Sequence, residues 1–308
     1  MAENTVKKIA TRESYGNSLK ELAEEFPNLV VLDADLAAAT KTGIFRKAYP
    51  DRHIDCGIAE ENMMGVAAGL SLVGKIPFVS SFAMFAAGRA FEQVRNSIGY
   101  PHLNVKIGAT HAGITVGEDG ATHQCNEDIA LMRTIPGMVV MCPSDDVEAR
   151  AAVRAALEYE GPVYIRFGRA AVPVINDHPG YHFEIGKGTV VREGKDVTIV
   201  ATGICVDSAL GAAKMLEEEG ISAEVVNICT IKPLDEEIIL NSAKKTGKVV
   251  TVEEHSVIGG LGSAVCDCLC AHYPVPVKKV GMQDVFGESG SAAALVEKYG
   301  LDAKGVYK

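Results

Sequence analysis

Short apolar segments alternate with longer segments of helical periodicity along the whole chain. Eight apolar segments are typical of strands, and they cover residues 30–32, 78–80, 105–107, 138–141, 163–165, 197–200, 223–226 and 248–252. Most lack the in-and-out alternation of half-exposed strands, as expected for parallel sheets that helices cover on both faces. Helical patterns lie between them, over residues 18–26, 62–72, 145–159 and 206–219. The alternation predicts an α/β fold with doubly wound, mostly parallel sheets.

A polar connection containing glycine and proline separates two such strand–helix series. It covers residues 168–180, and the second series begins near Asp196. Domain boundaries fall in segments of this kind. We therefore expect an N-terminal domain over residues 1–175, a linker over 176–185 and a smaller C-terminal domain over 186–308. A chain of 308 residues is long enough for about two domains.

Composition and charge limit the classes of partner. Hydrophobic residues make up 47% of the chain and charged residues 23%, as in an ordinary globular protein. The 30 basic and 40 acidic residues give a net charge of −10, which argues against binding a nucleic-acid backbone. No apolar run reaches the roughly 18 residues of a membrane helix, and the N-terminal segment lacks a signal core. We expect a cytoplasmic protein that binds neither nucleic acid nor membranes.

The cysteines fit the same compartment. There are eight, scattered mostly through apolar segments, and reduced thiols in a cytosolic protein are the best interpretation. The sequence Cys266-Asp267-Cys268-Leu269-Cys270 suggests a metal site, but its spacing does not match paired CxxC ligands. Cys266 and Cys270 also fall on one face of a predicted helix. We expect no metal bound by this chain.

One loop combines glycines with titratable side chains. Residues 108–124 follow a predicted strand and contain four glycines, His111, His123 and the pair Glu118 and Asp119. Open α/β sheets bind ligands at the carboxyl ends of their strands, and glycine lets the backbone approach a ligand. The loop is therefore either a ligand site or a turn-rich surface loop.

Two further segments also allow two interpretations. Glu60 lies at the start of a predicted helix, where a carboxylate either complements the helix dipole or has a catalytic role. Phe82 and Phe85 follow a strand, and at helical spacing they share a face. Such a pair belongs to the core or contacts a ligand.

Other polar segments give weaker indications. Arg12 and Arg169 are either surface residues or ligands for a phosphate, which the planar guanidinium binds in a bidentate manner. The segment Gly259-Gly260-Leu261-Gly262 suggests a phosphate loop but is not a complete GxGxxG motif.

Taken together, these segments resemble the transketolase family. Matching segments follow one another in the family's order and approximate spacing: Ala10-Thr11-Arg12, Asp33-Ala34-Asp35-Leu36, Gly57-Ile58-Ala59-Glu60, residues 81–85, residues 117–124, Phe167-Gly168-Arg169, residues 230–235, residues 252–255 and residues 259–263. The resemblance covers the family's pyrimidine-binding and C-terminal domains and essentially the whole chain. The family's diphosphate-binding domain, marked by Gly-Asp-Gly followed some thirty residues later by Asn, is not matched.

The resemblance implies the second subunit of a split, two-subunit transketolase. A separate N-terminal subunit would be the partner, in an α2β2 assembly with the active site between chains. The implied cofactor is thiamine diphosphate, with Mg²⁺ or Ca²⁺ held by the partner subunit. The implied reaction transfers a two-carbon ketol unit from a ketose phosphate to an aldose phosphate.

The resemblance also implies roles for residues at the cofactor. Glu60 matches the carboxyl group placed against a nitrogen of the aminopyrimidine ring. Phe82 and Phe85 match aromatic side chains that pack on that ring, and Asp35 matches an acidic residue near the cofactor and the subunit interface.

For the substrate, the match assigns Asp119 to a sugar hydroxyl and His123 to the donor oxygen, where charge develops. Arg12, His111 and Arg169 would bind the terminal phosphate as three potential cations. An acidic protein would then attract an anionic substrate locally rather than through its net charge.

Two departures from the family pattern leave questions open. A serine that often binds phosphate is replaced by Ala39, with Thr40 and Thr42 nearby. Residues 86–91 are one residue longer than in family patterns, so whether Arg89 or Phe91 reaches the site stays open.

Four alternatives remain. Deoxyxylulose-phosphate synthases are similar but typically have Arg at the position of Phe85, lack a residue like Glu118 and form one long chain. The beta subunit of the pyruvate dehydrogenase first component lacks the 117–123 motif. A catalytically idle partner subunit would keep the fold alone. A nucleotide-binding oxidoreductase would need a glycine-rich turn after the first strand, which is not evident here.

Overall fold

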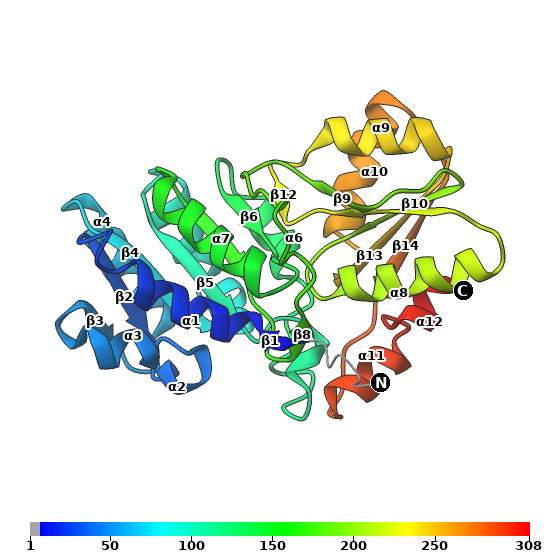
Figure 1. The fold of residues 1–308 in the computed structure, drawn as a ribbon. Helices are drawn as coiled ribbons and strands as arrows, with labels where there is room; N and C mark the ends of the chain where they lie inside the picture. Colours follow the sequence, from blue (N-terminus) through cyan, green and yellow to red (C-terminus); the bar gives the residue numbers. More distant parts are fainter. Residues whose placement is uncertain (1–6) are drawn as a thin grey trace.

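The computed structural model describes residues 7–308. These residues form two lobes, each built on its own sheet (Figure 1). All eight apolar segments expected to be strands overlap strands of the structure, and three of them begin one residue earlier than the strand. The prediction of an α/β fold with mostly parallel sheets is therefore confirmed.

The N-terminal sheet has seven strands in the order β12-β6-β7-β5-β4-β2-β3. They are β2 (Leu29–Asp33), β3 (His53–Asp55), β4 (Ile76–Phe82), β5 (Lys106–Thr110), β6 (Val139–Met141), β7 (Val163–Arg166) and β12 (Thr230–Lys232). All neighbours pair in parallel except β12, which is antiparallel to β6.

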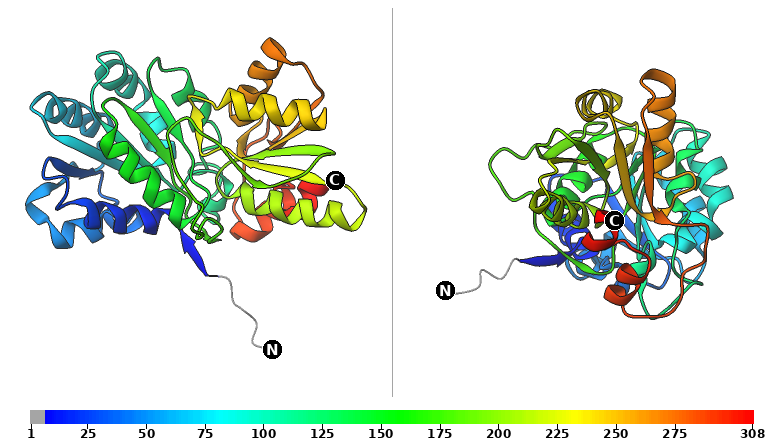
Figure 2. Two further views of the ribbon diagram at one scale, coloured as in Figure 1. Left: turned by 45° about the horizontal axis from the view of Figure 1, so that its top comes forward. Right: turned by 90° about the vertical axis from the view of Figure 1, so that its right-hand side faces the viewer.

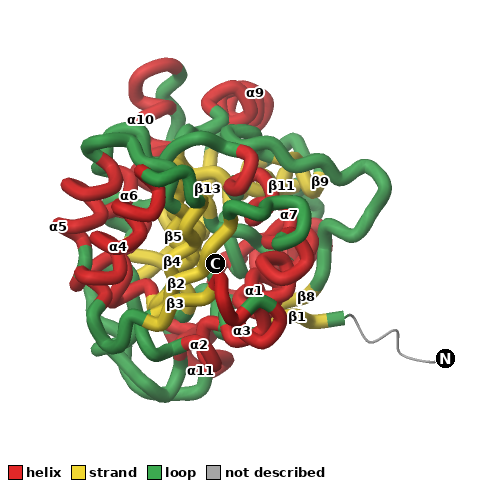
Figure 3. Tube along the Cα trace, turned by 90° about the vertical axis from the view of Figure 1, so that its left-hand side faces the viewer, coloured by secondary structure: helices red, strands yellow, loops and turns green. Residues whose placement is uncertain are grey.

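Helices cover both faces of this sheet (Figure 3). One face carries α1 (Thr11–Leu22), α3 (Gly43–Ala48) and α7 (Asp146–Glu158). The other carries α4 (Glu60–Leu72), α5 (Phe91–Gln93), α6 (Asp128–Arg133) and the π-helical turns η2 (Met84–Arg89) and η3 (Val94–Gly99). Within β2, Val31 packs toward α1 and Leu32 toward α4. Burial on both faces explains why the strands are continuously apolar.

The C-terminal sheet has five strands in the order β14-β13-β10-β11-β9. They are β9 (Thr189–Arg192), β10 (Val197–Ala201), β11 (Ala223–Asn227), β13 (Val249–Ser256) and β14 (Val277–Met282), and only β9 is antiparallel to its neighbour. Figures 1 and 2 show α8 (Cys205–Glu218) and α12 (Ala303–Tyr307) on one face, with α9 (Glu236–Thr246) and α10 (Leu261–His272) on the other.

The two lobes share structure. Strand β12 comes from the second half of the chain, yet it pairs with β6, and Thr230 lies opposite Met141. The sequence analysis did not predict this strand. A short antiparallel pair, β1 (Lys8–Ala10) with β8 (Ala171–Pro173), precedes the connection to β9. We retain the division at residues 176–185, between β8 and β9, as a proposal; the first six residues of the expected N-terminal domain lie outside the described residues.

The described residues carry no sign of a membrane span or a metal cluster. None of their helices has the length and apolar character needed to cross a bilayer. Within residues 7–308 no group of three or more histidine, cysteine or acidic side chains is arranged around a possible metal ion. All eight cysteines are free, and five of them are buried.

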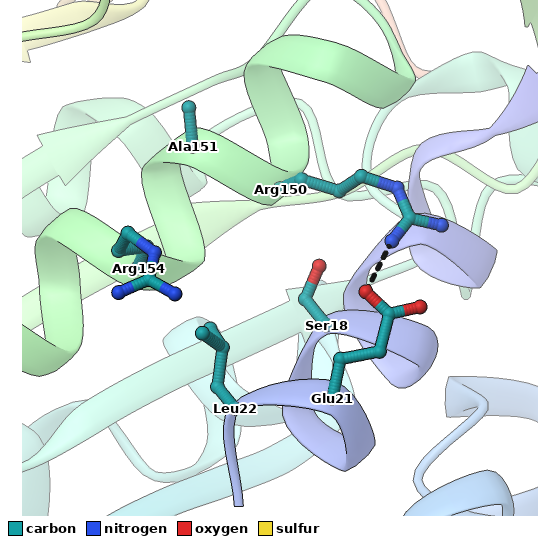
Figure 4. Close-up of a pocket in the computed structure, with 6 residues that line it drawn as sticks. All are labelled: Ser18, Glu21, Leu22, Arg150, Ala151 and Arg154. Carbon is teal, nitrogen blue, oxygen red and sulfur yellow. Dashed lines mark hydrogen bonds and ion pairs between the residues drawn. The ribbon is translucent and has the colours of Figure 1, made fainter. Parts of the chain in front are cut away.

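A surface pocket of about 220 Å³ lies between α1 and α7 (Figure 4). Its two arginines already have carboxylate partners. Arg150 Nη1 lies 2.8 Å from Glu21, and Arg154 Nη1 lies 2.7 Å from Glu25. No candidate site residue lines this pocket, so it lies outside the site analysed below.

Gly108 of β5 lets α1 pack closely on the sheet. A Cβ atom at this position would lie 2.4 Å from Cζ of Tyr15, whose buried ring stacks on Phe167 and whose hydroxyl lies 2.5 Å from Ser80 Oγ. We predict that Gly108→Ala lowers the free energy of unfolding by about 1–3 kcal/mol, since overpacking forces buried groups apart.

The matched control is Gly69→Ala, on the exposed side of α4, where a Cβ meets nothing within 4 Å. This change should leave stability equal or raise it by roughly 0.5–1 kcal/mol, because alanine favours a helix. Denaturant unfolding of both variants measures the difference, and equal effects would show that the contact between Gly108 and Tyr15 is unimportant.

Candidate functional site

The candidate residues lie where parallel strands end at one edge of the N-terminal sheet. Asp33 of β2 is paired with Ser80 of β4, which is paired with Gly108 of β5, so the strands run in register. Their carboxyl ends lead into the segments that carry the predicted residues, and β7 leads to Arg169 in the same way. This edge is where open α/β sheets bind ligands.

Glu60 begins α4 and is 1% exposed. Arg89 Nη1 donates to its Oε2 atom at 2.8 Å, and Ser81 Oγ donates to its Oε1 atom at 3.4 Å. The neighbouring Glu61 is exposed. A helix-dipole role alone would not require burial, and a buried carboxylate is costly unless it is paired. The structure therefore distinguishes the buried, hydrogen-bonded Glu60 from the exposed Glu61.

Four rings form an aromatic cluster beside Glu60. Phe82 stacks on His111 with 3.8 Å between ring centroids and lies nearly parallel to Phe85 at 6.0 Å. His123 meets Phe85 edge-on at 5.4 Å. The predicted aromatic pair and both predicted histidines are thus brought together from β4, η2 and the 108–124 loop.

His111 is buried between this cluster and Arg12. Arg12 Nη1 can only donate, so at 3.0 Å the Nε2 atom of His111 is the acceptor. The proton then sits on Nδ1, which donates to Thr110 Oγ1 at 2.9 Å. Burial, followed by the charges of Arg12 and Arg169, lowers the pKa of His111 to about 3. His111 is therefore neutral here, and the positive charge comes from the arginines.

Arg12 and Arg169 converge on the same region. Arg12 Nη1 also donates to the carbonyl oxygen of Ala39 at 2.9 Å, while its buried Nε atom has no partner among the described residues. Arg169 donates to the carbonyl oxygen of Val116 and pairs with Glu118 at 2.9 Å. Burial, then the charge of Arg169, lowers the pKa of Arg12. Two close guanidinium groups with spare donors form a suitable place for an anion.

The loop from Ala39 to Thr42 contributes a cation rather than hydroxyl groups. The hydroxyls of Thr40 and Thr42 both donate to Asp33 Oδ2, at 2.7 and 2.8 Å, so they are turned inward. Between them, Lys41 has a φ of 72°, and its charge also lowers the pKa of His111. The sequence analysis did not identify Lys41 as a candidate site residue. Its position depends on a left-handed backbone conformation that the sequence does not indicate.

Two predicted residues are less closely tied to the cluster. Asp119 is exposed, and within residues 7–308 its carboxylate has no hydrogen-bond or ion-pair partner. Asp35 is also exposed, with a φ of 60°, and its backbone N–H donates to Asp55 Oδ1 at 3.0 Å. Phe91 is partly buried against the apolar core.

The C-terminal lobe fixes the 108–124 loop. Glu254 Oε1 accepts the backbone N–H of Thr115 at 2.6 Å. Gln124 Nε2 donates to the carbonyl oxygen of Glu288 at 2.9 Å. Buried Arg166 pairs with Asp128 at 2.9 Å and donates to the carbonyl oxygen of Glu254 at 2.7 Å. The sequence analysis did not predict these contacts.

The glycine-rich segment at residues 259–262 already binds a carboxyl group from its own domain. The Glu253 carboxylate accepts the backbone N–H groups of Leu261 and Gly262 at 2.7 and 2.8 Å, at the start of α10. Burial raises the pKa of Glu253 to about 7. These N–H groups are not free for a ligand phosphate, so the structure does not support the phosphate-loop interpretation.

Family models match both lobes. The model described as "Transketolase, pyrimidine binding domain" covers residues 7–174, and "Transketolase, C-terminal domain" covers residues 186–306. The chain belongs to the transketolase family. The resemblance stated from the sequence is confirmed, and the family is dependent on thiamine diphosphate.

Relatives of similar length are transketolase sections or subunits. A putative transketolase C-terminal section from Methanocaldococcus jannaschii is 52% identical, and the match covers 96% of this chain and 94% of the relative. A 6-deoxy-6-sulfo-D-fructose transketolase subunit from Clostridium sp. (strain MSTE9) is 50% identical, with 96% and 92% covered. A solved structure described as "Split gene transketolase, inactive beta4 tetramer" is 59% identical, with a TM-score of 0.89 and coverage of 98% and 96%.

A deoxyxylulose-phosphate synthase is more distant. The enzyme from Heliobacterium modesticaldum is 40% identical, and the match covers 95% of this chain but only 45% of that protein. The higher sequence identities of the transketolase sections and subunits, and their coverage over nearly their full lengths, favour the transketolase interpretation over this alternative.

We predict that His111 stays neutral down to about pH 4. The unfolded chain binds a proton at the ordinary histidine pKa of about 6.5, whereas the folded chain does not until about pH 3, so acidification below 6.5 costs stability. Nitrogen NMR of the imidazole ring measures this pKa. Arg12→Met should move it upward by removing a neighbouring charge, and a wild-type midpoint near 6.5 would contradict the burial of the ring.

Proposed function

We propose that this chain is the pyrimidine-binding subunit of a two-subunit transketolase. The reaction is transfer of a two-carbon ketol unit from a ketose phosphate to an aldose phosphate. The observation that carries the proposal is the buried Glu60 carboxylate beside Phe85, at a strand-end site that also holds two histidines and two arginines. An idle subunit would have no need to keep these groups together.

The residues present fit the aminopyrimidine half of thiamine diphosphate. Glu60 would exchange a proton with a ring nitrogen, and Phe82 and Phe85 would pack on the ring. Asp35 is exposed, two residues after the end of β2, and would face a partner chain. When bound, the cofactor supplies a nucleophilic thiazolium carbon that no side chain can provide.

The substrate would bind at the opposite side of the aromatic cluster. Arg12 and Arg169, with Lys41 and the neutral His111, would bind the terminal phosphate. His123, edge-on to Phe85, would hydrogen-bond the donor oxygen as charge develops there. Asp119, exposed on its loop, would bind a sugar hydroxyl. Thr40 and Thr42 would not bind the phosphate, because the hydroxyl groups of both donate to Asp33.

The partner would be an N-terminal subunit that binds the diphosphate and its Mg²⁺ or Ca²⁺, in an α2β2 complex. Support comes from the relatives described as separate sections or subunits, which this chain matches over nearly their full lengths. The sugar remains open, since one such relative is described as acting on 6-deoxy-6-sulfo-D-fructose. We place the reaction among the sugar phosphates of the cytoplasm, with the pentose phosphates as first candidates.

Replacing Glu60 tests the proposed function. In a mixture with the N-terminal subunit, Glu60→Gln should keep the complex but lower kcat by about 10²-fold or more, because the amide cannot exchange the proton. Steady-state ketol transfer measures the rate, and circular dichroism checks the fold.

The matched control is Glu61→Gln, which makes the same change on the exposed neighbour. It should retain nearly the wild-type rate. A Glu60→Gln complex that also keeps this rate would show that another carboxylate has the assigned role.

A further inference from the structure

Arg89 lies between the two groups that are proposed to hold the aminopyrimidine. Its Nη1 atom donates to Glu60 Oε2 at 2.8 Å, and its Cζ atom lies 4.5 Å from the ring centroid of Phe85. The guanidinium is planar and rich in N–H donors, and it stacks well on an aromatic face. One side chain thus makes both contacts expected of the cofactor ring, the hydrogen bond to the carboxyl group and the stacking contact.

The local backbone explains how Arg89 reaches this place. The segment η2 winds as a π-helical turn, and the N–H of Ala90 donates to the carbonyl oxygen of Phe85 five residues earlier, at 3.1 Å. Such wide turns accommodate an additional residue in a helix. The wide turn sets Arg89 over Phe85.

The ion pair conflicts with the proposed role of Glu60. Arg89 Nη1 donates to Oε2, so a ring nitrogen that exchanges a proton through this oxygen would have to displace the guanidinium. A cofactor ring stacked on the face of Phe85 that Arg89 covers would displace the guanidinium as well.

We infer that Arg89 acts as a placeholder in the pyrimidine half-site, paired with Glu60 and stacked on Phe85, and that cofactor binding displaces it. The inference rests on the proposed function. The Arg89 side chain is 44% exposed, so it can swing into solvent, while Glu60 at its inner end is buried. While no cofactor is bound, the placeholder keeps a buried carboxylate paired.

The test is the affinity of the two-subunit complex for thiamine diphosphate, measured by calorimetry at fixed Mg²⁺. Arg89→Met keeps an apolar stem but removes the charge and the donors. It should bind the cofactor about tenfold more tightly, because no ion pair or cation–π contact has to be broken first. Arg89→Lys keeps the charge without the planar group, so its affinity should lie between those of the wild type and Arg89→Met.

The matched control is Arg95→Met, which removes an exposed arginine from η3. Among the described residues, the Arg95 side chain hydrogen-bonds only to Asn96. Its affinity should equal that of the wild type. Unchanged or weaker binding by Arg89→Met would overturn the inference while leaving the proposed function intact. If neither the wild-type complex nor any variant binds thiamine diphosphate, the proposed function fails and the inference fails with it.

Discussion

The parallel pairing of β2, β4, β5 and β7 is the constraint on which the site depends. Because these strands run in register, their carboxyl ends meet at one edge of the sheet, and segments distant in sequence reach one place. Helices on both faces bury the strands completely, which makes the sheet a rigid support. Shifting one strand by a residue would turn its side chains to the other face and separate Phe82 from His111.

Buried charge is the main cost of this arrangement, and three of the buried charged groups have polar partners. Glu60 is bonded to Arg89 and Ser81, Asp33 accepts two threonine hydroxyls, and Arg166 pairs with Asp128. Removing one partner from such a pair leaves an uncompensated charge in the interior. The charges therefore stabilise particular positions of the site loops more than they stabilise the fold as a whole.

The C-terminal lobe contributes to the site without supplying a predicted cofactor or substrate residue. Through Glu254 and the carbonyl oxygen of Glu288 it holds the middle and the C-terminal end of the loop that contains His111, Asp119 and His123. The apolar core is continuous between the lobes, and β12 completes the N-terminal sheet. The position of the loop thus depends on how the lobes pack against one another.

The sequence predicted the class of fold and the main strands because continuous burial leaves an unambiguous apolar pattern. The helical pattern over residues 18–26 is displaced from α1, which covers Thr11–Leu22, because buried Ser14 and Ser18 interrupt the apolar face of this helix. It missed β12, three residues whose pairing with β6 is a long-range contact. Local pattern carries little information on such pairing.

For the site, sequence motifs identified the candidate residues. They did not indicate the charge of each side chain or the backbone conformation that places it. His111 was expected as a potential cation, and burial between Phe82 and Arg12 makes it neutral. The position of Lys41 depends on its left-handed backbone conformation, and that of Arg89 depends on a π-helical turn. The type of side chain alone indicates neither conformation. The roles assigned to the site residues stay predictions.

Ketol transfer tests the central claim, that the active site is shared between two chains, most directly. Xylulose 5-phosphate and ribose 5-phosphate are incubated with thiamine diphosphate and Mg²⁺, with each subunit alone and with the mixture. The account predicts product only in the mixture. Product from this chain alone, or a stable complex that is inactive with every ketose phosphate tested, would contradict it.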